Sequence, residues 1–207
     1  MRKMGVMAWV AVILLIFAAM PGWNLADETW TLSKHSRGIQ VFARKIAGSK
    51  VESFKGICEI KAPMESVLSV FDDVPKATQW FASCLEARTL SQDGKTRRRV
   101  YYRFHIPWPF WNRDAVYDVS ARTEGDRTFI EAVAVNAPEV ACPKNHLRIT
   151  ESRQLWIIEK VGEKRTRLSY ESRIIPEGSI PPLLANKAFE GFVFHTMDNL
   201  KRLFQPA

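Results

Sequence analysis

A long amphipathic segment at the C-terminal end constrains the fold of this chain more than any other feature. Pro181-Pro182 opens it, and apolar residues recur at helical spacing as far as Phe204, which predicts a helix of about 22 residues. Its apolar face carries Ala185, Phe189, Phe192, Val193, Thr196, Leu200 and Leu203. Its polar face carries Lys187, Glu190, Asp198, Lys201 and Arg202. An apolar stripe of this length must lie against a large apolar surface supplied by the rest of the chain.

Strand patterns in the rest of the chain supply that surface. Apolar and polar residues alternate over 97–106, 114–122, 129–135, 153–160 and 165–175, and shorter extended pieces occupy 29–34, 39–45 and 51–60. Helical patterns are confined to a piece that starts at Pro63 and a short piece over 77–83, while 136–146 is irregular. Successive strands without intervening helices favour an antiparallel sheet. The sequence therefore predicts an α+β fold in which a curved antiparallel sheet wraps around the C-terminal helix.

The first 26 residues have a different character. Arg2 and Lys3 give a positive start, and 6–20 form an apolar run of 15 residues without a polar face, which disfavours a buried helix. A spanning helix needs about 20 apolar residues, so 1–26 have the length and flanks of a secretory signal peptide. Its removal would leave a single domain over 27–207, exported to the periplasm or secreted. Pro21 and Trp23 suit a cleavage site poorly, so the alternative is an uncleaved anchor that holds the domain at a membrane.

The charge balance is basic. The 30 Lys and Arg against 22 Asp and Glu give a net charge of +8, and 46% hydrophobic with 25% charged residues excludes a disordered chain or a multi-span membrane protein. A basic balance is compatible with nucleic acid, an anionic membrane or an acidic ligand. Because the basic residues are spread over several strands without a dedicated patch, no nucleic-acid partner is expected.

The segment Pro107-Trp108-Pro109-Phe110-Trp111-Asn112-Arg113-Asp114 resembles a loop of the START family, the steroidogenic acute regulatory protein-related lipid-transfer domains. In that family a loop of the form Pro-x-Pro-x-x-x-Arg-Asp leads into a central strand, and an alternating strand follows here too. Further matches are Trp30-Thr-Leu-Ser-Lys, Gly38-Ile-Gln-Val, Phe54-Lys-Gly, Asp73-Val74, Trp80 and the C-terminal helix. Together they extend the resemblance over residues 28–205.

The resemblance implies a helix-grip fold of the Bet v 1-like superfamily, with an internal apolar cavity for one lipid. It implies a lipid-binding or lipid-transfer protein in which the C-terminal helix and adjacent loops act as the gate. We expect a monomer and, from the lack of catalytic motifs noted below, no enzyme. The expected partner is a lipid or another apolar small molecule, with transient contact to a membrane. The alternative is a small helix-grip enzyme, cyclase- or hydrolase-like, that acts on an aromatic or polyketide-like substrate in the same cavity.

Side chains expected to point into the cavity are the candidate lipid contacts. Strand alternation assigns Tyr102, Phe104, Tyr117 and Tyr170 to the inner face of the sheet, and the terminal helix contributes Phe189, Phe192 and Val193. A buried phenol needs a hydrogen-bond partner, so the tyrosines have both an apolar and a polar part to offer a ligand. The same seven side chains would equally serve to fill a closed core.

Arg113 completes the set of candidate lipid contacts, since its guanidinium could bind a lipid phosphate. Adjacent strand residues point to opposite faces, so Arg113 and Asp114 are expected to have different partners, and a structural role is favoured for both. Trp108, Phe110 and Trp111 lie in the loop before them, where they either contact a membrane interface or pack against the end of the sheet.

Four arginines, Arg97, Arg98, Arg99 and Arg103, are expected on one basic strand face. Such a face could attract anionic lipid, although a solvated face is the commoner explanation.

Motifs for catalysis and metal binding are not apparent. The sequence has no Gly-x-Ser-x-Gly elbow, phosphate loop or paired catalytic carboxylates. Its histidines, His35, His105, His146 and His195, are scattered over different elements. Its cysteines, Cys58, Cys84 and Cys142, form no CxxC pair, although two of them could form a disulfide in an oxidising compartment. Cys58 is also interpreted as a small core residue of a strand. No catalytic residue, metal or cofactor is therefore expected.

Overall fold

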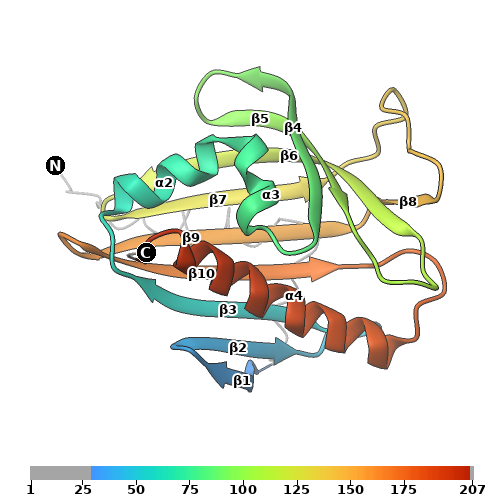
Figure 1. Cartoon of the computed structure of the whole chain (residues 1–207), viewed down its shortest axis with the longest axis horizontal. Helices are drawn as coiled ribbons and strands as arrows, with labels where there is room; N and C mark the ends of the chain where they lie inside the picture. Colours follow the sequence, from blue (N-terminus) through green and yellow to red (C-terminus); the bar gives the residue numbers. More distant parts are fainter. Residues whose placement is uncertain (1–28, 206–207) are drawn as a thin grey trace, which may run out of the picture.

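Ten strands form one sheet in the computed structural model, which describes residues 29–205. The order is β1-β2-β3-β10-β9-β7-β6-β5-β4, with β8 beside β6 (Figure 1). The strands are β1 (Thr31–Ser36), β2 (Ile39–Arg44), β3 (Ser53–Ile60), β4 (Cys84–Asp93), β5 (Arg97–Phe104), β6 (Asn112–Glu124), β7 (Arg127–Ala134), β8 (His146–Ile149), β9 (Ser152–Gly162) and β10 (Arg165–Ile174). The β6–β8 pair is parallel and the other pairs are antiparallel, which confirms the predicted antiparallel sheet.

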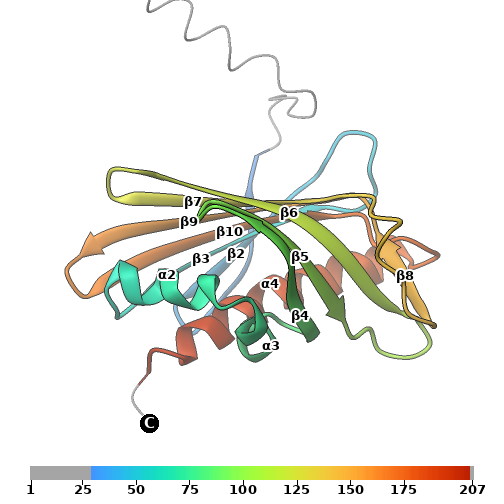
Figure 2. The same ribbon diagram turned by 90° about the horizontal axis from the view of Figure 1, so that it is seen from above.

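The helices lie together on the concave face of the curved sheet (Figure 2). They are α2 (Met64–Asp72), the 3-10 helix η1 (Val74–Lys76), α3 (Ala77–Trp80) and α4 (Pro182–Arg202). The start of α2 after Pro63 agrees with the prediction, whereas the helix expected over 77–83 ends at Trp80. The long helix α4 contacts β2 and β3. The fold is therefore the predicted sheet wrapped around a C-terminal helix.

Helix α4 packs closely on β3 because Gly56 has no side chain. A Cβ atom at position 56 would lie 2.8 Å from Met197 Cγ and 2.9 Å from Val193 Cγ1. Val193, Met197 and Leu200 are fully buried at this contact, each with 0% exposure. The C-terminal half of the amphipathic face thus lies directly on the sheet, as its pattern predicts.

The predicted polar face of α4 is partly wrong. Glu190 and Asp198 are buried, at 9% and 5% exposure, and Leu203, expected on the apolar face, is 42% exposed. The β1–β2 hairpin covers this flank of the helix, since Arg37 pairs with Asp198 at 2.6 Å and Ser33 donates a hydrogen bond to Glu190. Helical periodicity cannot reveal a hairpin contributed by the opposite end of the chain.

Two strands lie outside the predicted pattern. The edge strand β4 was not predicted, because most of its side chains are exposed and it shows little alternation. The second, β8, begins at the end of the stretch 136–146 that was expected to be irregular. This stretch folds back over the outer face of the sheet, where Tyr101, Val116 and Ala137 form a small second core.

The expected wet, basic face of the sheet needs correction. Asp114 is fully buried there and pairs with Arg148 at 2.7 Å, because the segment before β8 covers it. Arg99 pairs with Asp118 at 2.7 Å and Arg103 with Glu86 at 3.3 Å, so their charges are matched by carboxylates. Arg98 instead lies on the inner side, where it bonds to carbonyls of α2.

The cysteines are free thiols in the structure. Cys58 is 3% exposed, which confirms its interpretation as a core residue, and burial raises its pKa to about 12. Within 29–205, no His, Cys, Asp or Glu cluster could hold a metal ion. None of the helices in that range combines the length and apolarity needed to cross a bilayer. The segment 1–26, for which a signal peptide or anchor is expected, lies outside the described residues.

Candidate functional site

A small cavity lies inside the domain, between the α2–η1–α3 layer and the concave face of the sheet. Its volume is about 40 Å³. It is lined by Trp80 and Phe81 of the helical layer, Arg98 and Tyr102 of β5, and Gln154 and Trp156 of β9, among others. This volume suits a water molecule or two but not a lipid. The expected cavity for a whole ligand is therefore not present in this form of the protein.

Aromatic side chains fill the space that a lipid would need. Phe81 lies at the centre, with ring centroids 5.6 Å from Tyr102, 5.4 Å from Phe104 and 5.2 Å from Phe192. On the other side of the cavity, Trp156 stacks on Tyr170 at 4.0 Å. These rings come from the helical layer, from the sheet and from α4. A ligand can enter only if the rings of at least two of these elements separate.

A chain of buried hydrogen bonds forms the polar part of this interior. The Tyr117 hydroxyl donates to Ser152 Oγ at 2.9 Å and accepts from Gln154 Nε2 at 3.0 Å. The Tyr170 hydroxyl donates to Gln154 Oε1 at 3.1 Å. Burial raises the pKa of Tyr117 to about 12 and that of Tyr170 well above its usual value, so both phenols stay protonated at neutral pH. The two phenols thus have the partners that buried tyrosines require.

Two other polar groups at the cavity have no such partner in the described chain. The indole Nε1 of Trp80 is buried and makes no hydrogen bond. Tyr102 is partly buried, and burial raises the pKa of its phenol, which the nearby Arg98 charge lowers only in part. The guanidinium of Arg98 donates to the carbonyl of Phe71 at 2.6 Å and more weakly to that of Asp72, which fixes it at the end of α2.

Arg113 ties two loops together at one end of the domain. Its guanidinium donates to the carbonyls of Pro176 and Glu177 before α4, at 2.6 and 2.7 Å, and to the carbonyl of Trp111 in the β5–β6 loop. Burial lowers its pKa. These bonds occupy the guanidinium, so a structural role replaces the lipid contact considered for Arg113. Together with the Asp114–Arg148 pair, they confirm that Arg113 and Asp114 have different partners.

An exposed apolar end results from this arrangement. The β5–β6 loop presents Trp108 and Trp111 at 90% and 54% exposure, while Phe110 is partly buried. The first turn of α4 presents Leu183 and Leu184 at 81% and 53% exposure. Because Arg113 joins the two segments, their exposed side chains belong to one end of the molecule, which we call the aromatic end. Packing against the sheet, the alternative for the loop aromatics, therefore does not apply to Trp108.

A model of the family described as polyketide cyclase / dehydrase and lipid transport matches residues 60–201, more than half of the chain. The chain belongs to this family. Its fold is shared by the STAR-related lipid transfer protein (fragment 25–204) of Xanthomonas axonopodis, with 28% identity and a TM-score of 0.77 over 86% of this chain and 99% of that one. The START resemblance and the helix-grip fold are thereby confirmed.

Two proteins are also similar to this chain in sequence. An uncharacterized protein of Pseudomonas aeruginosa is 28% identical over 178 residues, which cover 86% of this chain and 88% of the relative. The phosphatidylcholine transfer protein of Rattus norvegicus is 24% identical over 169 residues, which cover 79% of this chain and 78% of the relative. The similarity to START-related proteins thus extends over most of the domain.

Only some of the predicted lipid contacts lie at the inner cavity of this START domain. Tyr102 lines the cavity. Phe104 and Phe192 touch its Phe81 wall, and Tyr117 and Tyr170 reach it through Gln154. The remaining helix positions lie elsewhere, with Val193 on Gly56 and Phe189 packed at the side of the core.

Sequence reasoning missed several cavity residues of this START domain, among them Trp80, Phe81, Arg98, Gln154 and Trp156. A usable signal existed for the last two, because Gln154, Trp156 and Ile158 alternate on one face of the predicted strand 153–160. No local signal marked Trp80 and Phe81, which lie at the end of a four-residue helix.

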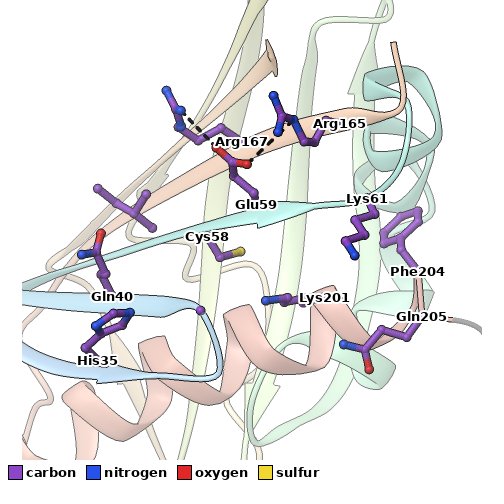
Figure 3. A pocket seen from close by; sticks show the side chains of 12 residues that line it. His35, Gln40, Cys58, Glu59, Lys61, Arg165, Arg167, Lys201, Phe204 and Gln205 are labelled. Carbon is purple, nitrogen blue, oxygen red and sulfur yellow. Dashed lines mark hydrogen bonds and ion pairs between the residues drawn. The ribbon is translucent and has the colours of Figure 1, made fainter. Parts of the chain in front are cut away.

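A more open hollow lies elsewhere, at the C-terminal end of α4, with a volume of about 1060 Å³ (Figure 3). It is an open notch beyond the β1–β2 turn, and Figure 3 shows Lys61, Arg165 and Lys201 around it. Glu59 in its wall pairs with Arg167 at 3.0 Å, and Lys201 donates to the Arg37 carbonyl at 2.8 Å. A charged, open wall does not suit an acyl chain, so this notch is not the lipid cavity expected of a START domain.

Proposed function

We propose that this protein binds one lipid between the concave face of its sheet and its helices, and transfers it between membranes without catalysing a reaction. The observation that carries the proposal is the match of the whole domain to the STAR-related lipid transfer protein of Xanthomonas axonopodis. Sequence similarity to phosphatidylcholine transfer protein supports the same kind of ligand. The aromatic interior supports it too. When its rings separate, acyl chains can pack between them, so that the rings exchange contacts with one another for apolar contacts with the lipid.

Uptake of a lipid requires an opening between the helices and the sheet. The N-terminal half of α4 is the part that would move, because it is less buried than the C-terminal half. Val193, Met197 and Leu200 hold the C-terminal half on the sheet with no exposure. In the N-terminal half, Ala185 is buried, but Leu183 is exposed and Phe192 is only partly buried. Separation of Phe192 from Phe81 would enlarge the interior, and a lipid that buries a few hundred Å² of apolar surface gains several kcal/mol, at about 25 cal/mol per Å².

The aromatic end gives this gate a membrane contact. Trp108, Trp111, Leu183 and Leu184 are the kind of side chains that enter a membrane interface, where indole rings are favoured at the headgroup level. The two tryptophans lie in the β5–β6 loop, and the two leucines lie in the first turn of the moving half of α4 itself. Transient docking of this end would open the gate at the membrane surface, so that the lipid need not cross water. Export of the chain through its segment 1–26 would place this exchange in the periplasm or outside the cell.

The charged groups that line the inner cavity support the proposal that the protein does not catalyse a reaction. Among the described residues, Asp73 is the one carboxylate that lines it. Asp73 pairs with Lys76 at 2.7 Å, and this pair lowers its pKa. A carboxylate with a lowered pKa is a weak general base, so the cyclase-like alternative has little chemistry to use here.

Native mass spectrometry and a vesicle transfer assay test the proposal. The full chain should carry a co-purifying lipid, or take up phosphatidylcholine from vesicles, and should speed movement of fluorescent phosphatidylcholine from donor to acceptor vesicles. Phe192→Ala should change the transfer rate, while Arg122→Ala, on an exposed strand end, should not. A chain that neither carries nor takes up lipid would refute the proposed function.

A further inference from the structure

We propose that the indole N–H of Trp80 holds an anionic oxygen of the bound lipid, with Arg98 and Tyr102 beside it. The inference rests on the proposed lipid-binding function and specifies the ligand class. The ligand would be a lipid whose carboxylate or phosphate oxygen reaches the inner cavity, rather than a neutral lipid without such an oxygen.

The first observation is the unpaired donor. Trp80 is 4% exposed, and its Nε1 makes no hydrogen bond within the described chain. Buried donors nearly always have a partner, and leaving one unpaired is costly. The nearby phenols Tyr117 and Tyr170 bond to Gln154 and do not accept from the indole. Trp80 therefore has an unused donor at a cavity wall.

Packing prevents the indole from turning toward solvent instead. Its ring centroid lies 5.2 Å from that of Phe71, 5.3 Å from that of Phe81 and 5.7 Å from that of Trp156. These rings enclose Trp80 from α2, from the residue that follows its own helix and from β9. The donor is thus held in place before any ligand arrives, which lowers the entropy cost of binding.

The second observation is the charge beside this donor. Arg98 lines the same cavity, and its hydrogen bonds to the Phe71 and Asp72 carbonyls fix its guanidinium at the end of α2. Asp72 lies 3.9 Å from Arg98 Nη1 but is 81% exposed, and Asp73 pairs with Lys76 at 2.7 Å, so a solvated carboxylate matches the Arg98 charge only weakly. The Tyr102 hydroxyl adds a further donor, since it has no hydrogen bond within the described chain. The fixed positive charge and the donors together favour an oxygen that carries negative charge.

A binding comparison of three single substitutions at this cavity tests the inference. Trp80→Phe removes the N–H and keeps an aromatic ring, and Trp156→Phe makes the same change in the opposite wall. The probes are oleate, phosphatidylglycerol and oleyl alcohol, each measured by displacement of a fluorescent fatty acid. Oleate and phosphatidylglycerol distinguish a free carboxylate from a phosphate headgroup as the source of the oxygen.

The expected result is selective. Trp80→Phe should weaken at least one of the two anionic probes about tenfold or more and leave oleyl alcohol within about twofold, as for loss of one hydrogen bond to a charged group. Trp156→Phe should not show this selectivity. Arg98→Gln should reduce the preference for the anionic probe in the same direction.

Other outcomes would overturn the inference in distinguishable ways. Equal weakening of all probes by Trp80→Phe would show a packing role alone, and no weakening would show that water satisfies the indole. A wild-type chain that binds none of the probes or phosphatidylcholine would instead refute the proposed function. If Trp80→Phe does not fold, the indole N–H resonances of the wild-type chain give the answer, because the Trp80 signal should shift downfield with oleate and not with oleyl alcohol.

Discussion

Arg148 on β8 holds both carboxylate oxygens of Asp114 on β6, at 2.9 and 2.7 Å, beneath the segment that crosses the outer face of the sheet. Asp114 is fully buried, and Arg148 also bonds to the carbonyls of Ala137 and Val140. One arginine thus attaches the covering segment to the strand that follows the Arg-Asp motif. The Asp114–Arg148 pair holds the covering segment on the outer face of the sheet, while Arg113 joins the β5–β6 loop to the segment before α4.

Asp114→Ala should destabilise the domain by about 3–5 kcal/mol, because it leaves the largely buried guanidinium of Arg148 without its carboxylate counter-charge. Urea unfolding followed by circular dichroism measures the change in the free energy of unfolding. Glu124→Ala is the control, since the exposed pair of Glu124 with Arg122 should contribute less than about 1 kcal/mol. Similar effects of the two substitutions would contradict the structural role of Asp114.

Gly56→Ala should destabilise the domain by about 1–3 kcal/mol through overpacking, because the new Cβ would lie 2.8 Å from Met197 Cγ. The added methyl group must push α4 away from β3 or force Met197 and Val193 into strained rotamers. Thermal unfolding measures the loss. Met197→Ala, introduced together with Gly56→Ala, should restore part of the lost space, so a double variant no better than expected from the sum of both losses would argue against this contact.

Alkaline pH should unfold the domain through its buried phenols. Tyr117 has a pKa of about 12 in the fold against 10.0 for the free group. Below pH about 10 both states are protonated and the full stability is present; above it the unfolded chain ionises first, so the free energy of unfolding falls. The loss for Tyr117 should reach about 2 kcal/mol by pH about 12. Denaturant unfolding at a series of pH values measures it, and a Tyr117→Phe variant should lose stability less steeply.

The sequence predicted the parts of the fold that depend on local pattern. The alternation in 97–106 and 165–175 and the apolar face of α4 each repeat at short range, and the structure contains all three. Contacts between distant segments were not predictable in this way. Burial of Asp198 depends on Arg37 from the first hairpin, and burial of Asp114 depends on Arg148 from a stretch with no recognisable pattern.

The candidate site shows the same limit. Tyr102 was placed correctly because its strand alternates clearly, and it lines the cavity. The sequence marks Trp80 only through the family resemblance, since a four-residue helix has too few residues to show which face is buried. The size of the cavity was not predictable either. It depends on how far Phe81 and Phe192 fill the interior, which no pattern along the chain encodes.

Trp108→Ser together with Trp111→Ser should weaken binding to lipid vesicles at least about fivefold, because each indole contributes apolar and interfacial contact at the headgroup level. Stability should change by less than about 0.5 kcal/mol for Trp108→Ser alone, since this side chain is 90% exposed. Leu32→Ser is the matched control: Leu32 is 50% exposed on the edge strand β1, away from the aromatic end, and its substitution should leave vesicle binding unchanged. Vesicle co-sedimentation gives the bound fraction. Equal losses of binding for the double tryptophan variant and for Leu32→Ser would show that the aromatic end does not dock on the membrane.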